Sequence, residues 1–219
     1  MKFVINQPAL IIENKLIISD LHLGFEKHIK DLNIKSQTQK MIKNTVELLK
    51  ENKCNELIIL GDIKHSITIT PDLTEVKEYL NEVKKHAKII LVKGNHDGGL
   101  QNYLNIEIKP ATGFKYKKYY FMHGHAVPKG AENCFIISSH LHPVMDFNNT
   151  LSGKTTEKVW LKANNLVIMP SFNPLLGGID VRKSDLGVLK KQFDKKELDI
   201  YLLNGLYLGK VKKLQKVKK

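Results

Sequence analysis

The chain has 219 residues, of which 42% are hydrophobic and 26% are charged, and it contains two cysteines. This length suits one α/β domain with a sizeable core. No apolar stretch approaches the roughly 20 residues of a membrane helix, and residues 1–13 lack the long apolar core of a signal peptide. We therefore expect a cytoplasmic protein without a membrane partner. Cys54 and Cys134 form no CxxC pair, which argues against a zinc ribbon or a redox dithiol.

The formal net charge of +13 comes almost wholly from lysine, because Arg182 is the only arginine. Recognition of base edges and bidentate clamping of phosphates both favour arginine, so the composition argues against a sequence-specific reader of nucleic acid. A diffuse positive field still attracts polyanions. Binding of DNA or RNA without sequence specificity therefore remains open.

The first half of the chain alternates short apolar runs with helical patterns. Continuous apolar runs predict three buried strands, at residues 15–19, 56–60 and 88–92. A helical face recurs over about residues 37–52. A second helix is expected from Thr70 onward, with Thr70 as the N-cap and Pro71 as the first helical residue.

After residue 97 the pattern changes to strands without long helices between them. Apolar runs predict strands at residues 118–122, 134–138, 158–161 and 165–169. Asn204-Gly205 lies between two further apolar runs and predicts a hairpin turn. We expect a single domain over residues 1–211, followed by a lysine-rich, solvated tail at 212–219.

This order of elements predicts an α/β fold in layers, with mixed β-sheets covered by helices. The sheet order is expected to be parallel in the first half of the chain and antiparallel in the second half. In α/β sheets the carboxyl ends of parallel strands gather at one edge, where ligands bind. Residues that follow different strands can therefore meet at that edge.

Five short clusters of Asp, Asn and His each follow one of the expected strands. They are residues 20–22, 61–62, 94–97, 123–125 and 140–142. A single cluster would be explained by turn chemistry, and a single histidine by a structural role. Together, however, they provide nitrogen and oxygen ligands without sulfur, a set that suits Mn, Fe or Zn better than Ca. The clusters therefore predict two adjacent divalent metals and metal-assisted attack on a phosphate ester.

These clusters resemble the motifs of the calcineurin-like metallophosphoesterase superfamily, which run DxH, GDxx, GNH followed by D or E, H, and GHxH. The matching segments are Asp20-Leu21-His22, Gly61-Asp62, Gly94-Asn95-His96-Asp97, His123 and Ser139-His140-Leu141-His142. Ser139 replaces the usual glycine of GHxH. The chain is most similar to the small archaeal and bacterial branch related to the SbcCD nuclease subunit, on the segments at 20–26, 61–65, 123–125 and 170–178.

The resemblance implies a ligand set for each of two divalent metal ions. We expect Mn first, with Fe, Zn or Ni as alternatives. The first ion would be held by Asp20, His22, Asp62 and His142. The second would be held by Asp62, Asn95, His123 and His140, so that Asp62 bridges the two ions. A hydroxide between the metals would attack phosphorus in line.

The resemblance also implies roles outside the metal ligands. His96 would be the general acid toward the leaving oxygen, and Asp97 would orient it. Substrate contacts are expected from His65, His125 and Asn173. His28 and His86 lie outside the motifs and are expected at the surface.

The leading hypothesis is a metal-dependent phosphodiesterase that acts on a nucleic acid or a nucleotide, in company with a DNA-repair helicase, ligase or nuclease. A cyclic nucleotide, a nucleotide diphosphate ester or an oligonucleotide end would suit a small open site equally well. The alternative function is a non-catalytic scaffold or a nucleic-acid-binding partner built on the same fold. A scaffold is expected to lack ligands, whereas all seven ligands and His96 are present here, which favours an enzyme.

Overall fold

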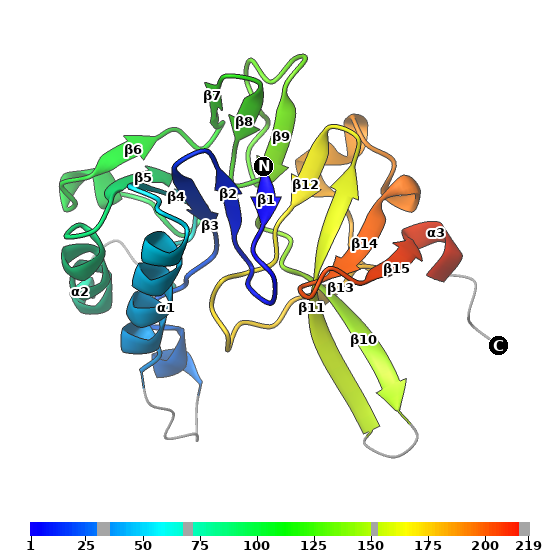
Figure 1. Ribbon diagram of the computed structural model, residues 1–219, viewed down its shortest axis with the longest axis horizontal. Helices are drawn as coiled ribbons and strands as arrows, with labels where there is room; N and C mark the ends of the chain where they lie inside the picture. Colours follow the sequence, from blue (N-terminus) through cyan, green and yellow to red (C-terminus); the bar gives the residue numbers. More distant parts are fainter. Residues whose placement is uncertain (30–35, 68–71, 150–152, 215–219) are drawn as a thin grey trace.

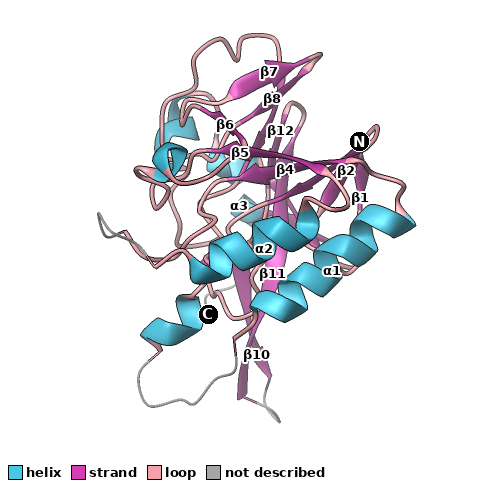
Figure 2. Cartoon of the chain, turned by 90° about the vertical axis from the view of Figure 1, so that its left-hand side faces the viewer, coloured by secondary structure: helices cyan, strands magenta, loops and turns pink. Residues whose placement is uncertain are grey.

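Two β-sheets pack face to face, and two helices cover the outer side of the first sheet (Figure 1). This computed structural model describes residues 1–29, 36–67, 72–149 and 153–214. The helices α1 (Thr38–Glu51) and α2 (Thr74–Val83) lie side by side across that outer face (Figure 2). The predicted α/β fold with mixed sheets in layers is confirmed.

The first sheet contains the strands predicted near the N-terminus. Its order is β1 (Lys2–Phe3), β2 (Leu10–Ile12), β3 (Lys15–Ile18), β4 (Glu56–Leu60), β5 (Lys88–Val92) and β6 (Glu107–Lys109). Strands β3 to β6 are parallel, whereas β1, β2 and β3 pair antiparallel. Strands β3, β4 and β5 are rich in apolar residues because helices cover one face of the sheet and the second sheet covers the other.

The second sheet is larger and more mixed than we expected. Its path runs β13 (Ile179–Asp180), β10 (Pro143–Asn149), β11 (Gly153–Ala163), β12 (Leu166–Ile168), β9 (Phe135–Ser138), β8 (Tyr119–Phe121) and β7 (Phe114–Tyr116). A hairpin of β14 (Asp199–Leu202) and β15 (Tyr207–Lys210) joins it through β11. The hairpins are antiparallel, as predicted, but β8, β9 and β12 run parallel to one another. The carboxyl ends of β8 and β9 therefore lie at one edge.

The apolar core is divided into three clusters. One lies between the two helices and the first sheet, and a second lies between the two sheets, where Trp160 and Phe121 are buried. The third lies on the outer face of the second sheet, which is covered by η3 (Gly187–Lys191), η4 (Lys195–Glu197) and α3 (Val211–Leu214). Because buried residues cover both faces of each sheet, both sheets are fixed relative to each other at the edge that carries the five clusters.

Several boundaries differ from the sequence predictions. Thr70 and Pro71 lie outside the described residues, and α2 is described from Thr74. The first residues of the predicted tail belong to α3, and residues 215–219 lie outside the described part. Strand β10 begins with Pro143 and contains polar residues, so its pairing with β11 could not be recognised locally. No helix in the described part of the chain combines the length and hydrophobicity needed to cross a bilayer.

Candidate metal centre

The five clusters meet at the carboxyl ends of β3, β4, β5, β8 and β9. The pairing of β3 with β4 continues into the loops that follow them. Leu23 donates its backbone N–H to Ile63 O (2.9 Å), and His22 donates to Asp62 O (2.8 Å). The residues 20–23 and 61–65 therefore run side by side, which brings the first two clusters together.

Five predicted ligands have a left-handed backbone that non-glycine residues rarely adopt. Their φ angles are +52° at Asp20, +41° at His22, +49° at Asp62, +71° at His140 and +42° at His142. Each such residue costs on the order of 1–3 kcal/mol and persists only where the surrounding structure holds it. Backbone strain of this kind concentrates at functional sites, so its coincidence with the predicted ligands is a strong indication of function.

A first group of possible ligands consists of Asp20, His22 and His142, whose ligand atoms all lie within 4.8 Å of one another. His142 Nε2 lies 3.1 Å from Asp20 Oδ1. Both His22 Nε2 and His142 Nε2 are buried, and neither forms a hydrogen bond with any residue that the structure describes. A buried nitrogen without a partner is costly, and a cation would satisfy both lone pairs. This group therefore fits a divalent metal.

A second group consists of Asp62, His123 and His140, again with ligand atoms within 4.8 Å. Asp62 Oδ2 lies 3.4 Å from His123 Nε2 and 3.5 Å from His22 Nε2. Asp62 thus faces a histidine of each group, as a bridging ligand must. Asn95, also expected at the second metal, is exposed in the turn after β5.

The electrostatics of the centre favour cations. Burial opposes ionisation of Asp20, yet His142 and His123 hold its pKa well below the usual value. Burial lowers the pKa of His22 to about 3 and that of His140 to about 4. Contact with Asp20 raises the pKa of His123 against the opposing effect of burial. Ionised Asp20 beside neutral His22 and His140 is the protonation state that metal ligands require, whereas His123 would release a proton when it binds a metal.

Two histidines that are expected to contact substrate lie against predicted ligands. His65 Nδ1 lies 3.3 Å from His22 Nδ1, and His125 Nδ1 lies 2.8 Å from His123 Nδ1. Both His65 and His125 are half-buried, so each still has some exposed surface. A hydrogen bond to the second nitrogen fixes the ring orientation of a ligating histidine. Exposed His28 packs its ring 4.7 Å from that of His65.

His96 lies beside this centre with its ring held in one orientation. Its backbone N–H donates to Asp62 Oδ1 (2.9 Å), and its Nδ1 lies 2.5 Å from the carbonyl oxygen of His65. A carbonyl only accepts hydrogen bonds, so Nδ1 carries a proton and Nε2 is left for other contacts. The His65 carbonyl therefore orients the His96 ring.

Asp97 has a different role from the one we expected. Its carboxylate is fully buried and accepts backbone N–H groups from Asp62 (2.8 Å), Ile63 (3.1 Å) and Gly94 (2.8 Å). Burial, together with the charge of Asp62, raises its pKa to about 6. Asp97 thus joins the loop at residues 61–65 to the loop at residues 94–97 by hydrogen bonds. The prediction that it orients His96 is corrected.

Glycines in the motifs allow the loops to approach this closely. A Cβ at Gly94 would lie 2.1 Å from Asp62 Oδ1, and one at Gly61, where φ is +77°, would lie 2.4 Å from His123 Cδ2. Ser139 stands where the family motif has glycine, and its hydroxyl donates to Leu60 O (2.8 Å), which ties the two sheets together. Only glycine therefore fits at Gly61 and Gly94, because any Cβ would displace the side chain of a predicted ligand.

Two lysines near the centre were missed by sequence reasoning. Lys64 is 2% exposed and its ammonium donates to Ser66 O. Lys158 of β11 donates to Ser171 O (2.7 Å) and to Asn173 O (2.5 Å). For Lys64, the only local signal was its position shortly after Gly61-Asp62. Nothing local distinguishes the second from the other lysines of the chain.

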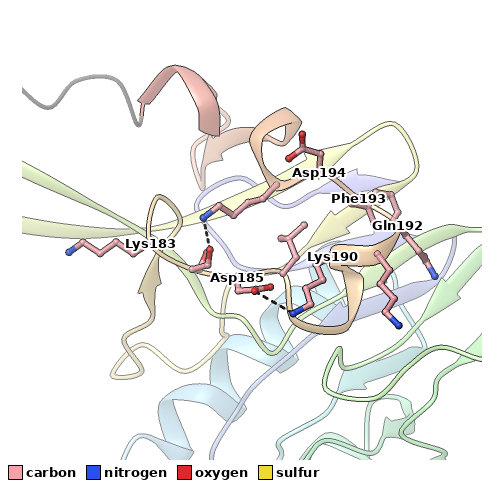
Figure 3. A pocket seen from close by; sticks show the side chains of 10 residues that line it. Lys183, Asp185, Lys190, Gln192, Phe193 and Asp194 are labelled. Atoms are coloured by element: carbon pink, nitrogen blue, oxygen red, sulfur yellow. Dashed lines mark hydrogen bonds and ion pairs between the residues drawn. The ribbon is translucent and has the colours of Figure 1, made fainter.

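A separate cavity of about 660 Å³ lies among residues 183–186 and 190–195 (Figure 3). It shares no residue with the two ligand groups and contains no histidine. One of its carboxylates, Asp185, lies 3.8 Å from Lys190 Nζ. This cavity therefore lacks the chemistry that the strand-end clusters provide.

Comparison with known proteins identifies a family and similar folds. Residues 15–203 match the family model described as calcineurin-like phosphoesterase. A solved structure of the nuclease MPE from Pseudomonas putida is 22% identical, covers 89% of this chain and 88% of its own, and superimposes with a TM-score of 0.65, which supports the fold. The phosphoesterase YfcE from E. coli is 20% identical, with 89% and 96% coverage and a TM-score of 0.43. No curated protein matches the chain.

Proposed function

The chain belongs to the calcineurin-like phosphoesterase family of metal-dependent hydrolases, and from that premise we propose that it hydrolyses a phosphodiester of a nucleic acid or nucleotide. The observation that carries the proposal is the position of Asp62. Its Oδ2 lies 3.5 Å from His22 Nε2 and 3.4 Å from His123 Nε2, between two groups of possible ligands. A carboxylate in that position suits a site for two cations.

We propose that two divalent cations, Mn before Fe, Zn or Ni, occupy this centre. The first would be held by Asp20, His22, Asp62 and His142, and the second by Asp62, Asn95, His123 and His140. When bound, the cations would activate water as the nucleophile and neutralise charge on the phosphoryl oxygens. The Nε2 atoms of His22 and His142 support this assignment, because they face carboxylates but form no hydrogen bond with any described residue.

The remaining residues would orient and transfer protons. The His65 carbonyl keeps the Nδ1 proton of His96 in place, and in the doubly protonated ring Nε2 would donate its proton to the departing alkoxide and leave a neutral imidazole. His96 is half-buried at the rim of the centre, where a substrate can reach it. His65 and His125 orient His22 and His123, and their exposed edges remain available to substrate.

A phosphodiester of a polyanion is the substrate class we favour. The net charge of +13 attracts polyanions, and the structurally similar protein from P. putida is a nuclease. The same reasoning makes a helicase, ligase or nuclease of DNA repair the first class of partner to test. We also propose a cytoplasmic location.

The test is a substrate panel with the purified protein. It contains a nitrophenyl diester and monoester, cyclic nucleotides, and single- and double-stranded DNA and RNA, each assayed with Mn²⁺ and then with chelator. We expect Mn²⁺-dependent cleavage of diesters that chelator abolishes. If no substrate is hydrolysed with Mn²⁺ or Fe²⁺ while nucleic acid still binds tightly, the alternative of a non-catalytic binding protein replaces the enzyme.

A further inference from the structure

The segment at residues 170–175 crosses directly behind the loop that carries Asp20 and His22. Phe172 donates its backbone N–H to Ser19 O (2.8 Å), and the Ser19 hydroxyl donates to Pro170 O (3.3 Å). These two segments are about 150 positions apart in the chain. Their pairing is therefore a tertiary contact that supports the loop.

Asn173 provides the side-chain contacts of this support. It is 0% exposed, and its Nδ2 donates to Leu21 O (2.8 Å) and His22 O (3.5 Å). Its Oδ1 accepts the backbone N–H of Leu175 (2.9 Å). The amide group is thus used on both sides, and a fully buried side chain offers no surface to a substrate. The predicted substrate contact of Asn173 is replaced by a contact with the ligand loop.

The hydrogen bonds from Asn173 matter because the loop is strained. Asp20 and His22 both have left-handed backbones, with φ of +52° and +41°. The N–H groups of His22 and Leu23 still pair with the neighbouring loop, but the carbonyls of Leu21 and His22 need donors from elsewhere. Asn173 supplies the donor at Leu21 O, between the two ligands, and adds a longer contact at His22 O, which also accepts the backbone N–H of Phe25 (3.0 Å).

Lys158 connects this support to the second sheet. Its ammonium donates to the carbonyls of Ser171 and Asn173, which attaches the segment at residues 170–175 to β11. Burial lowers its pKa to about 8, while the charge of Asp20 opposes that effect. His142 follows β9 of the same sheet, whereas Asp20 and His22 follow β3 of the first sheet. Both sheets therefore position the first ligand group.

We propose that Asn173 is a positioning residue for the first metal group, Asp20, His22 and His142, and has no role at the second group. The inference rests on the proposed function, because it requires that the first group binds a cation. Its physical basis is that the Asn173 amide holds the carbonyls of Leu21 and His22, in the loop that carries Asp20 and His22, but contacts none of the residues of the second group in the described part of the chain.

The experiment measures Mn²⁺ binding by titration calorimetry in two backgrounds. His140→Ala leaves the first group intact, and His22→Ala leaves the second group intact. Adding Asn173→Ala should weaken Mn²⁺ binding about 10- to 100-fold in the first background and leave it unchanged in the second. Asn52→Ala is the matched control, because Asn52 also donates its amide to a backbone carbonyl, Leu48 O (3.0 Å), but lies at the end of α1.

Two further variants separate hydrogen bonding from packing. Asn173→Asp retains the size and the acceptor for Leu175 but loses the donor, so it should weaken the first site at least as much as alanine. Asn173→Ser keeps one hydroxyl donor and should have an intermediate effect. Melting of the metal-free variants shows which of them are folded, and binding is compared among those.

The outcomes distinguish this inference from the proposed function. Equal Mn²⁺ affinity of Asn173→Asp and the parent in the His140→Ala background would overturn the positioning role. Equal weakening in both backgrounds would also overturn it, because a general structural defect affects both groups. If the unmodified protein binds no Mn²⁺, the proposed function itself fails.

Discussion

Replacing Asp97 with alanine should lower the free energy of unfolding by more than the replacement of any exposed aspartate does. The carboxylate accepts three buried backbone N–H groups, from Asp62, Ile63 and Gly94, at 2.8–3.1 Å. Each donor left without an acceptor costs about 1–2 kcal/mol, so the expected loss of unfolding free energy is about 3–6 kcal/mol. The same change would release the backbone of Asp62 and so weaken the proposed bridge.

Urea denaturation of the protein in excess chelator measures this loss without a contribution from bound metal. Asp194→Ala is the control, since Asp194 also accepts a backbone N–H, from Lys196 (2.9 Å), at an exposed position. It should cost less than about 1 kcal/mol. A loss within about 1 kcal/mol for Asp97→Ala would refute the assignment of Asp97 as the fastener of the two loops.

Three further predictions test the centre and the fold. His96→Ala should keep Mn²⁺ binding and reduce turnover about 10²- to 10⁴-fold, most for esters with poor leaving groups, whereas Asp62→Ala should abolish metal binding and turnover; full activity of either variant contradicts the assignment. Gly94→Ala should cost about 1–3 kcal/mol and impair Mn²⁺ binding, because its Cβ would meet Asp62 Oδ1 at 2.1 Å, whereas Gly98→Ala meets nothing within 4 Å; equal urea midpoints would contradict this. Burial opposes ionisation of Asp180, but hydrogen bonds from Arg182 hold its pKa at about 2, below the unfolded value of 3.8. Its contribution, roughly 1–2 kcal/mol, should therefore be present above pH 3.8 and lost as the pH falls through about 2, and Asp180→Asn should remove this dependence in acid denaturation.

The roles of Asp97 and His65 show where motif spacing is insufficient. Asp97 follows His96 in the chain, which suggested a contact between the two side chains. The structure instead directs Asp97 toward backbone N–H groups of residues 62 and 63, and the carbonyl of His65, 31 positions from His96, orients the imidazole. Neighbouring residues in a turn point in different directions, so adjacency in sequence does not establish a side-chain contact.

The strands and the ligand candidates were accessible from the sequence because their signals are local. Continuous apolar runs marked β4 and β5 with the observed boundaries, Glu56–Leu60 and Lys88–Val92. The clusters that follow them were recognised from residue type and from position after a strand. These properties depend on a few consecutive residues and were sufficient to predict the edge at which the clusters meet, whereas the family was predicted from their resemblance to known motifs.

The contacts that shape the centre were decided only by the tertiary structure. His123 meets Asp20 across 103 positions of sequence, and Asn173 meets Leu21 across 152. Whether a polar residue faces solvent or a strained loop depends on which strands pair and how the two sheets stack. No local pattern carries that information, so the sequence alone determined which residues can bind metal, and the packing of the sheets determined which residues hold them in place.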